Sequence, residues 1–73
     1  MTGHELQRLR RRSGLSLVAF GACLGVGGKR ESVARAVRRL EGLAEQPLPP
    51  STARMARAIA NKLARIESGE LEP

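Results

Sequence analysis

The sequence has few of the residues on which very small folds rely. Its 73 residues include a single cysteine, a single phenylalanine, and no tryptophan or tyrosine. One cysteine excludes an internal disulfide, and no Cys/His cluster has the spacing of a metal site. A chain this short holds one domain, which excludes large multidomain enzymes. We therefore expect an aliphatic core in a reducing cytoplasm, with a second subunit supplying the stability that a small core lacks.

Charge of one sign dominates the first part of the chain. Thirteen Lys and Arg residues against seven acidic residues give a net charge of +6. Within residues 1–42, nine basic side chains accompany three carboxylates, whereas the two signs balance after residue 42. Such a one-sided positive field attracts a polyanion, either nucleic acid or an anionic membrane.

An uncharged stretch over residues 13–28 follows three consecutive arginines, which is also the composition of a signal peptide. Residues 20–23 even loosely resemble a lipoprotein cleavage site. However, the apolar run over residues 15–24 is too short to span a bilayer, and Ser16 and Gly21 interrupt it. Cleavage there would leave the remainder without a core. We therefore expect no membrane segment.

Local signals predict a helix over residues 3–13. Thr2 and Glu5 have the spacing of a capping box, and Gly14 is a suitable left-handed stop. A second helix is expected over residues 17–24, with Ser16 as its N-cap. A glycine inside this second helix, at position 21, costs about 1 kcal/mol relative to alanine and indicates a close approach by another helix.

Two further helices follow from hydrophobic spacing. The third is expected over residues 31–43, with Val33, Val37 and Leu40 facing inward and charged residues facing outward. Three prolines make an extended connector, and the fourth helix is expected over residues 51–66 with Ser51 as its cap. No strand pattern appears. Residues 1–66 would thus form a single domain, followed by a flexible acidic tail over residues 67–73.

Signals for an enzyme are weak. Gly28 and Lys29 resemble the end of a phosphate loop, but that motif also needs glycine at Cys23 and serine or threonine at Arg30. His4 is the only histidine, and the chain has no aspartate to orient it. Cys23 is expected to be a small core residue on the inward side of its helix. We expect no enzymatic activity, no cofactor or metal, and no small-molecule ligand.

Two segments carry a family resemblance. Residues 14–26 resemble the "GLSxxxLAxxLGV" pattern of Cro/XRE-like helix-turn-helix regulators, and residues 37–50 are similar to the "TVRRWExG…PIP" pattern that ends their DNA-binding unit. Leu40 replaces the tryptophan, Leu17 replaces a polar residue, and residues 27–32 are additional to the usual spacing. The resemblance implies an all-α, compact four- to five-helix domain of the lambda-repressor-like type.

In that family arrangement, the third helix enters the major groove and the second crosses the DNA backbone. Arginine is the best reader of guanine, because its guanidinium forms a two-pronged hydrogen bond. The expected base contacts are Lys29, Arg30, Glu31, Ser32, Arg35 and Arg38. The expected phosphate contacts are Arg11, Arg12, Ser16 and Arg39. The alternative is that these charges only solvate a surface, and this alternative is favoured for Arg8 and Arg10.

Four hydrophobic residues form a stripe along one side of the fourth helix. This stripe has two compatible uses, which are closing the core and pairing with a second subunit. Its members are Met55, Ile59, Leu63 and Ile66, of which the first two are expected nearer the core and the last two nearer a two-fold axis.

The charge pattern and the resemblance together predict a homodimeric, sequence-specific transcriptional regulator on an inverted-repeat operator in double-stranded DNA. The resemblance implies an autoregulatory repressor or a controller of a mobile-element operon, cytoplasmic and nucleoid-associated. The alternative is a protein-binding helical module, an antitoxin or anti-activator with an acidic protein partner.

Overall fold

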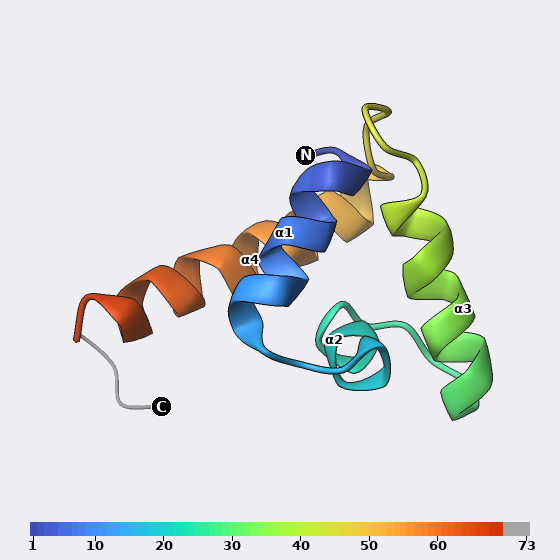
Figure 1. Ribbon diagram of the computed structural model, residues 1–73, viewed down its shortest axis with the longest axis horizontal. Helices are drawn as coiled ribbons and strands as arrows, with labels where there is room; N and C mark the ends of the chain where they lie inside the picture. The colour runs from blue at the N-terminus through green and yellow to red at the C-terminus, as the bar shows by residue number, and fades with distance from the viewer. Residues whose placement is uncertain (70–73) are drawn as a thin grey trace.

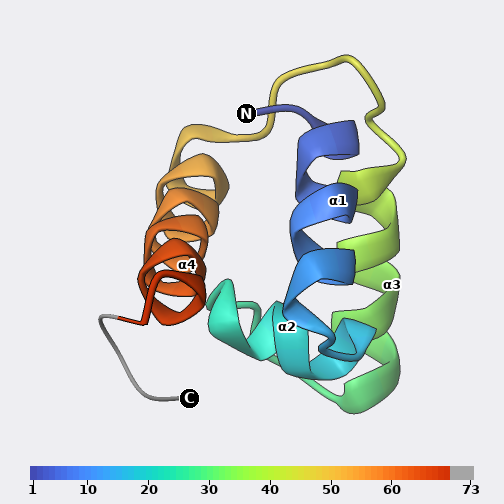
Figure 2. The same ribbon diagram turned by 60° about the vertical axis from the view of Figure 1, so that its left-hand side comes forward.

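The computed structural model describes residues 1–69, which form four helices. These are α1 (Gly3–Ser13), α2 (Leu17–Cys23), α3 (Arg30–Glu41) and α4 (Pro50–Glu67). The shorter α2 packs across α3, and α1 lies between α3 and α4 (Figures 1 and 2). Residues 1–69 contain no strand, only an isolated bridge between Thr2 and Pro47. The all-α prediction is therefore confirmed for a compact domain of four helices.

The predicted boundaries of α1 are confirmed. The Thr2 hydroxyl accepts the Glu5 amide at 3.3 Å, and the Glu5 carboxylate accepts the Thr2 amide at the same distance. The helix ends at Gly14, whose φ of 71° lies in the left-handed region that glycine adopts without strain. Leu6 and Leu9 are buried, so one face of α1 is committed to the core.

The close approach expected at Gly21 is also present. Phe20 is fully buried, and a Cβ at Gly21 would lie 2.3 Å from Val33 Cγ1 and 3.0 Å from Val37 Cγ2. The helix α2 therefore sits so close to α3 that a Cβ at this position would force the valine side chains to shift. Its N-cap is Ser16, as expected, but it ends at Cys23, one residue earlier than predicted, because Leu24 takes the cap position.

The prediction of α3 over residues 31–43 was wrong at both ends. The helix begins one residue earlier and ends at Glu41, after which the chain turns and Ala44 takes a φ of 57°. This turn meets the start of α1, where the His4 amide donates to the Ala44 carbonyl at 3.0 Å. A Cβ at Gly3 would lie 2.6 Å from the Leu40 carbonyl oxygen. The helix stops because its last turn and the following chain pack directly on the α1 backbone.

The start and end of the last helix also differ from expectation. Pro50 is its first residue and Pro49 holds the cap position, so Ser51 is not the cap. Proline suits the first helical position because it has no amide to leave unsatisfied there. Glu67 belongs to α4 and Ser68 caps it, so the predicted tail over residues 67–73 begins too early. The rest of that predicted tail, residues 70–73, lies outside the described residues.

The core is aliphatic apart from one ring, as predicted. Its buried members are Leu6, Leu9, Phe20, Leu24, Val33, Val37, Leu48, Ala53 and Ala56. Helix α4 contributes Ala53 and Ala56 to this core, whereas Met55, expected near it, is 41% exposed. Leu63, expected nearer a two-fold axis, packs against the core instead. The reason is that small side chains on α4 let this helix approach α1. Met55 then lies at the side of α4 and not in the contact between the two helices.

The prediction that Cys23 is a core residue was also wrong, because its side chain is exposed. Phe20, Gly21 and Leu24 are the buried residues at this end of α2. The uncharged stretch therefore folds as a helix packed on α3. Among the helices that the structure describes, none has the length and apolar character needed to cross a bilayer.

The Gly21 contact gives a direct test of how tightly α2 is held. We expect Gly21→Ala to destabilise the fold by about 1–2 kcal/mol, because overpacking against the two valines outweighs the gain in helix propensity. The control is Gly27→Ala, where a Cβ would meet nothing within 4 Å. Urea unfolding followed by circular dichroism measures both, and equal stability of Gly21→Ala and the parent chain would contradict the close packing.

Candidate nucleic-acid interface

The outward side of α3 is an exposed, positively charged surface. It comprises Lys29, Arg30, Glu31, Ser32, Arg35, Arg38 and Arg39, all of them exposed, and we call it the α3 basic face. Five of the seven side chains are cationic and one is acidic. Within residues 1–69, none of these five cations forms an ion pair. The cations are therefore available to an external anion.

Helical geometry explains why the charges gather there. Val33 and Val37 are 5% and 0% exposed, and both pack toward α2. Arg35 follows Val33 by two residues, which places it about 200° around the helix axis. Residues 38 and 39 repeat this outward position one turn later. The burial of two valines therefore fixes the direction in which the arginines point.

Residues 27–32, which are additional to the pattern that the sequence resembles, are divided between loop and helix. Residues 27–29 remain in the loop, where Gly28 has a φ of 114°, and residues 30–32 form the first turn of α3. Arg30, Glu31 and Ser32 are therefore carried on the helix itself. Lys29 holds the cap position without a side-chain cap hydrogen bond. The uncapped amides at this end add partial positive charge beside Lys29 and Arg30.

Two of the four predicted phosphate contacts lie near that end of α3. Arg11 and Ser16 are exposed at the corner between α1 and α2. This corner and the start of α3 lie at the same end of the molecule (Figure 2). The Ser16 hydroxyl oxygen accepts the Ala19 amide at 3.1 Å, which leaves its proton free to donate. Arg39 lies in the last turn of α3, at the other end of that helix.

Arg12, the remaining predicted phosphate contact, is not placed with the α3 basic face. Its guanidinium pairs with Glu67, the last residue of α4, and both side chains are about half exposed. It also lines a hollow between α1 and α4. The structure therefore directs Arg12 toward α4, on the side of α1 that faces away from α3.

The prediction that Arg10 is a solvated surface charge was wrong. Its Nε donates to Glu41 Oε2 at 2.6 Å, and its Nη2 donates to Oε1 at 3.1 Å. The Glu41 side chain is only 8% exposed. The hydrogen bond to Glu41 raises the pKa of Arg10 above its usual value, with the charge attraction adding to it and burial opposing it. Arg10 therefore neutralises the carboxylate that ends α3, which leaves the arginines of the α3 basic face uncompensated.

The stripe predicted for dimer contact borders an open apolar hollow of about 220 Å³. Ile59, Leu63 and Ile66 line it, together with Ser13, Leu15, Cys23 and Lys62. Leu15 and Met55 are the two large hydrophobic side chains that the described residues leave exposed. Sequence reasoning missed Leu15 and Cys23, since their proximity to α4 is set by tertiary packing. We call the residues that line this hollow, together with the exposed Met55 of the same stripe, the α4 apolar flank.

No candidate metal site is found in residues 1–69. No group of three or more His, Cys, Asp or Glu side chains is placed to hold a metal ion there. His4 and Cys23 are both exposed and lie on different helices. Comparisons with protein-family models, with curated proteins and with solved structures find no match for this chain.

The two ion pairs are expected to contribute differently to the free energy of unfolding. We expect Arg10→Ala to lower the free energy of unfolding by about 1–3 kcal/mol, because Glu41 would remain buried without its partner. Arg12→Ala, the control, removes an exposed pair and should cost less than about 1 kcal/mol. Denaturant unfolding of both variants at one protein concentration measures the difference. A smaller loss for Arg10→Ala than for Arg12→Ala would contradict the assigned roles.

Proposed function

We propose that this protein is a sequence-specific DNA-binding transcriptional regulator of the helix-turn-helix type, with a lambda-repressor-like fold. The observation that supports the proposal most strongly is the α3 basic face, on which five exposed cations accompany a single carboxylate. Such a helix suits the major groove of DNA, which is about 12 Å wide and admits one α-helix. The packing of Gly21 on α3 supports it further, because it makes α2 and α3 a rigid pair.

The proposed contacts divide by position on that pair. Arg30, Arg35 and Arg38 are the preferred readers of guanine, and Lys29, Glu31 and Ser32 act beside them. Arg11, Ser16 and Arg39 hold phosphates on either side. Phosphate contacts set the register on DNA, whereas base contacts set the sequence preference. Arg12 reaches a phosphate only if it releases Glu67, so its contribution is the smallest of the phosphate set.

We further propose that two copies pair through the α4 apolar flank. Small domains bury too little apolar surface to be comfortably stable alone, and closed two-fold pairs are the commonest oligomers. Met55 and Leu15 are exposed, and Ile66 is half-buried beside the open hollow. A dimer would present two α3 basic faces to an inverted repeat with half-sites about 34 Å apart. Autoregulation of a mobile-element operon in the cytoplasm follows from the family resemblance.

The reading face is tested with the DNA fragment just upstream of the coding region. We expect Arg35→Ala or Arg38→Ala to cost about 1–3 kcal/mol of binding and to relax preference at one base position. Arg39→Ala, a matched substitution on the same helix, should weaken binding to all sequences alike and reduce the salt slope by about 1. Fluorescence anisotropy over a panel of operator variants measures both effects. Full discrimination by both base-contact variants would show that another surface reads the sequence, and retention that is only nonspecific would favour the protein-binding module.

The dimer is tested at exposed positions, because Leu63 also packs on the core. We expect Met55→Glu and Ile66→Glu to shift the chain to a monomer and to lower operator affinity, since each places a charge in the α4 apolar flank, where the two copies would meet. The control is Asn61→Glu, at an exposed position elsewhere on α4. Light scattering gives the mass of each variant. An unchanged mass for Met55→Glu and Ile66→Glu would remove α4 from the interface.

A further inference from the structure

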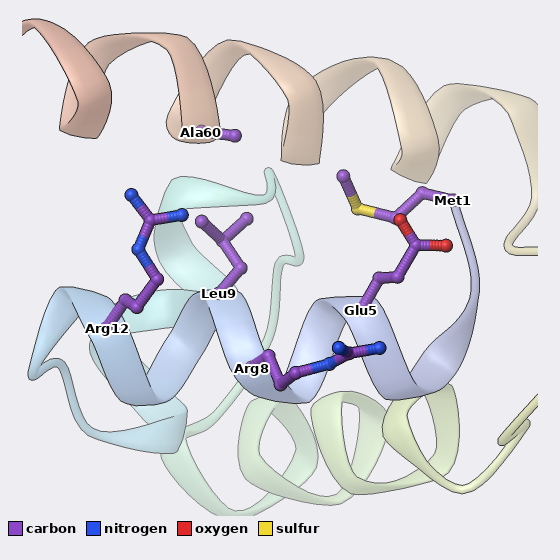
Figure 3. A pocket seen from close by; sticks show the side chains of 6 residues that line it. All are labelled: Met1, Glu5, Arg8, Leu9, Arg12 and Ala60. Carbon is purple, nitrogen blue, oxygen red and sulfur yellow. The ribbon is translucent and has the colours of Figure 1, made fainter.

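A second basic surface follows the seam between α1 and α4. One hollow of about 340 Å³ is lined by Met1, Glu5, Arg8, Leu9, Arg12 and Ala60 (Figure 3). Another of about 460 Å³ is lined by Met1, Pro47, Leu48, Pro50, Ala53, Arg54 and Arg57. Met1 lines both hollows, the first between α1 and α4 and the second beside the start of α4. We take the two together as one surface, which we call the α1–α4 groove.

Four arginines border this groove, two from each helix. Arg8 and Arg12 are one turn apart on α1, and Arg54 and Arg57 are one turn apart on α4. In Figure 3 the Arg12 side chain rises from α1 toward α4, and that of Arg8 extends along α1. Within residues 1–69, Arg8, Arg54 and Arg57 form no ion pair. Three of the four guanidinium groups are therefore open to an anion.

Two carboxylates lie near these charges and offset part of them. Glu5 accepts hydrogen bonds from the Thr2 amide and hydroxyl, so it is held at the start of α1. Glu67 is held by Arg12 at the far end of the seam. Glu5 keeps its negative charge beside Arg8, and Glu67 offsets Arg12, so the net positive charge of the groove lies mainly with Arg54 and Arg57.

The groove is separate from both surfaces of the proposed function. Because α1 lies between α3 and α4, the groove is on a different side of α1 from the α3 basic face (Figure 2). Arg57 follows Met55 by two residues, which turns it about 200° around α4 from the apolar flank. A dimer bound to an operator would therefore leave two such grooves uncovered.

We propose that the α1–α4 groove binds the phosphate backbone of a second DNA duplex, so that the operator-bound protein bridges two DNA segments. This inference rests on the proposed function for the first duplex. Guanidinium groups match phosphate oxygens in a two-pronged geometry. The groove has no aromatic side chain on which single-stranded bases stack, and none of its lining residues is a neutral reader of base edges, so a duplex backbone of any sequence is its expected occupant.

A bridging assay with the full chain tests this inference. Operator DNA is fixed to beads, and recovery of a labelled duplex of unrelated sequence is measured together with anisotropy on a short operator alone. The parent chain should recover the labelled duplex, and this recovery should fall steeply with salt. Arg54→Ala/Arg57→Ala should lower recovery by about tenfold while operator affinity changes by less than about twofold. The control, Arg54→Lys/Arg57→Lys, keeps the charge and should retain most of the recovery.

Each other outcome overturns the inference. Recovery that survives Arg54→Ala/Arg57→Ala would mean that the two α3 basic faces of a dimer bridge the duplexes. Loss of operator affinity in that variant would mean that the groove touches the same duplex as α3. Displacement of the labelled duplex by low concentrations of poly-glutamate would make an acidic protein the occupant. Operator binding without any recovery defeats the inference alone, whereas absent operator binding defeats the proposed function.

Discussion

The packing of α2 on α3 through Gly21 is the constraint on which the rest of the structure depends. With no Cβ at this position, α2 reaches the side chains of Val33 and Val37 directly, and both valines are almost completely buried. Once these two residues face α2, the rotation of α3 about its own axis is fixed. The arginines two residues away then have no direction except outward. A contact between aliphatic groups therefore determines where a strongly charged surface lies.

The carboxylates of the fold complete that separation of roles. Glu5 closes the start of α1, Glu41 receives Arg10, and Glu67 receives Arg12. Each partner lies on α1 or just before it, so the acidic side chains hold α1 to its own cap and to both of its helical neighbours. Glu41 is nearly buried, whereas Glu5 and Glu67 are exposed, so only the Glu41 charge is withdrawn from the surface. None of these three carboxylates lies on the α3 basic face, where Glu31 is the single acidic residue.

Features that depend on a few neighbouring residues, such as helix caps, could be predicted from the sequence. Contacts between residues far apart in the chain could not. Thr2 with Glu5 and Gly14 predicted α1 because a cap depends only on its own turn. The Arg10–Glu41 pair spans 31 residues, and no local pattern links the two. The stripe on α4 misled at Met55, because a hydrophobic pattern favours large side chains, whereas Ala53 and Ala56 are the residues of α4 that are buried. The exposed positions on α3 were predictable, since burial of its valines alone determines them.

Shared use of α4 explains how so short a chain offers two further surfaces besides the α3 basic face. Each helix has one side in the core, which leaves two flanks to be used separately. On α4 these flanks are apolar around Ile66 and basic around Arg54 and Arg57. Since the flanks belong to one rigid helix, an apolar contact on one side fixes the spacing of the basic groups on the other. Pairing of two copies would therefore set the geometry of the α3 basic faces and of the α1–α4 grooves in a single step.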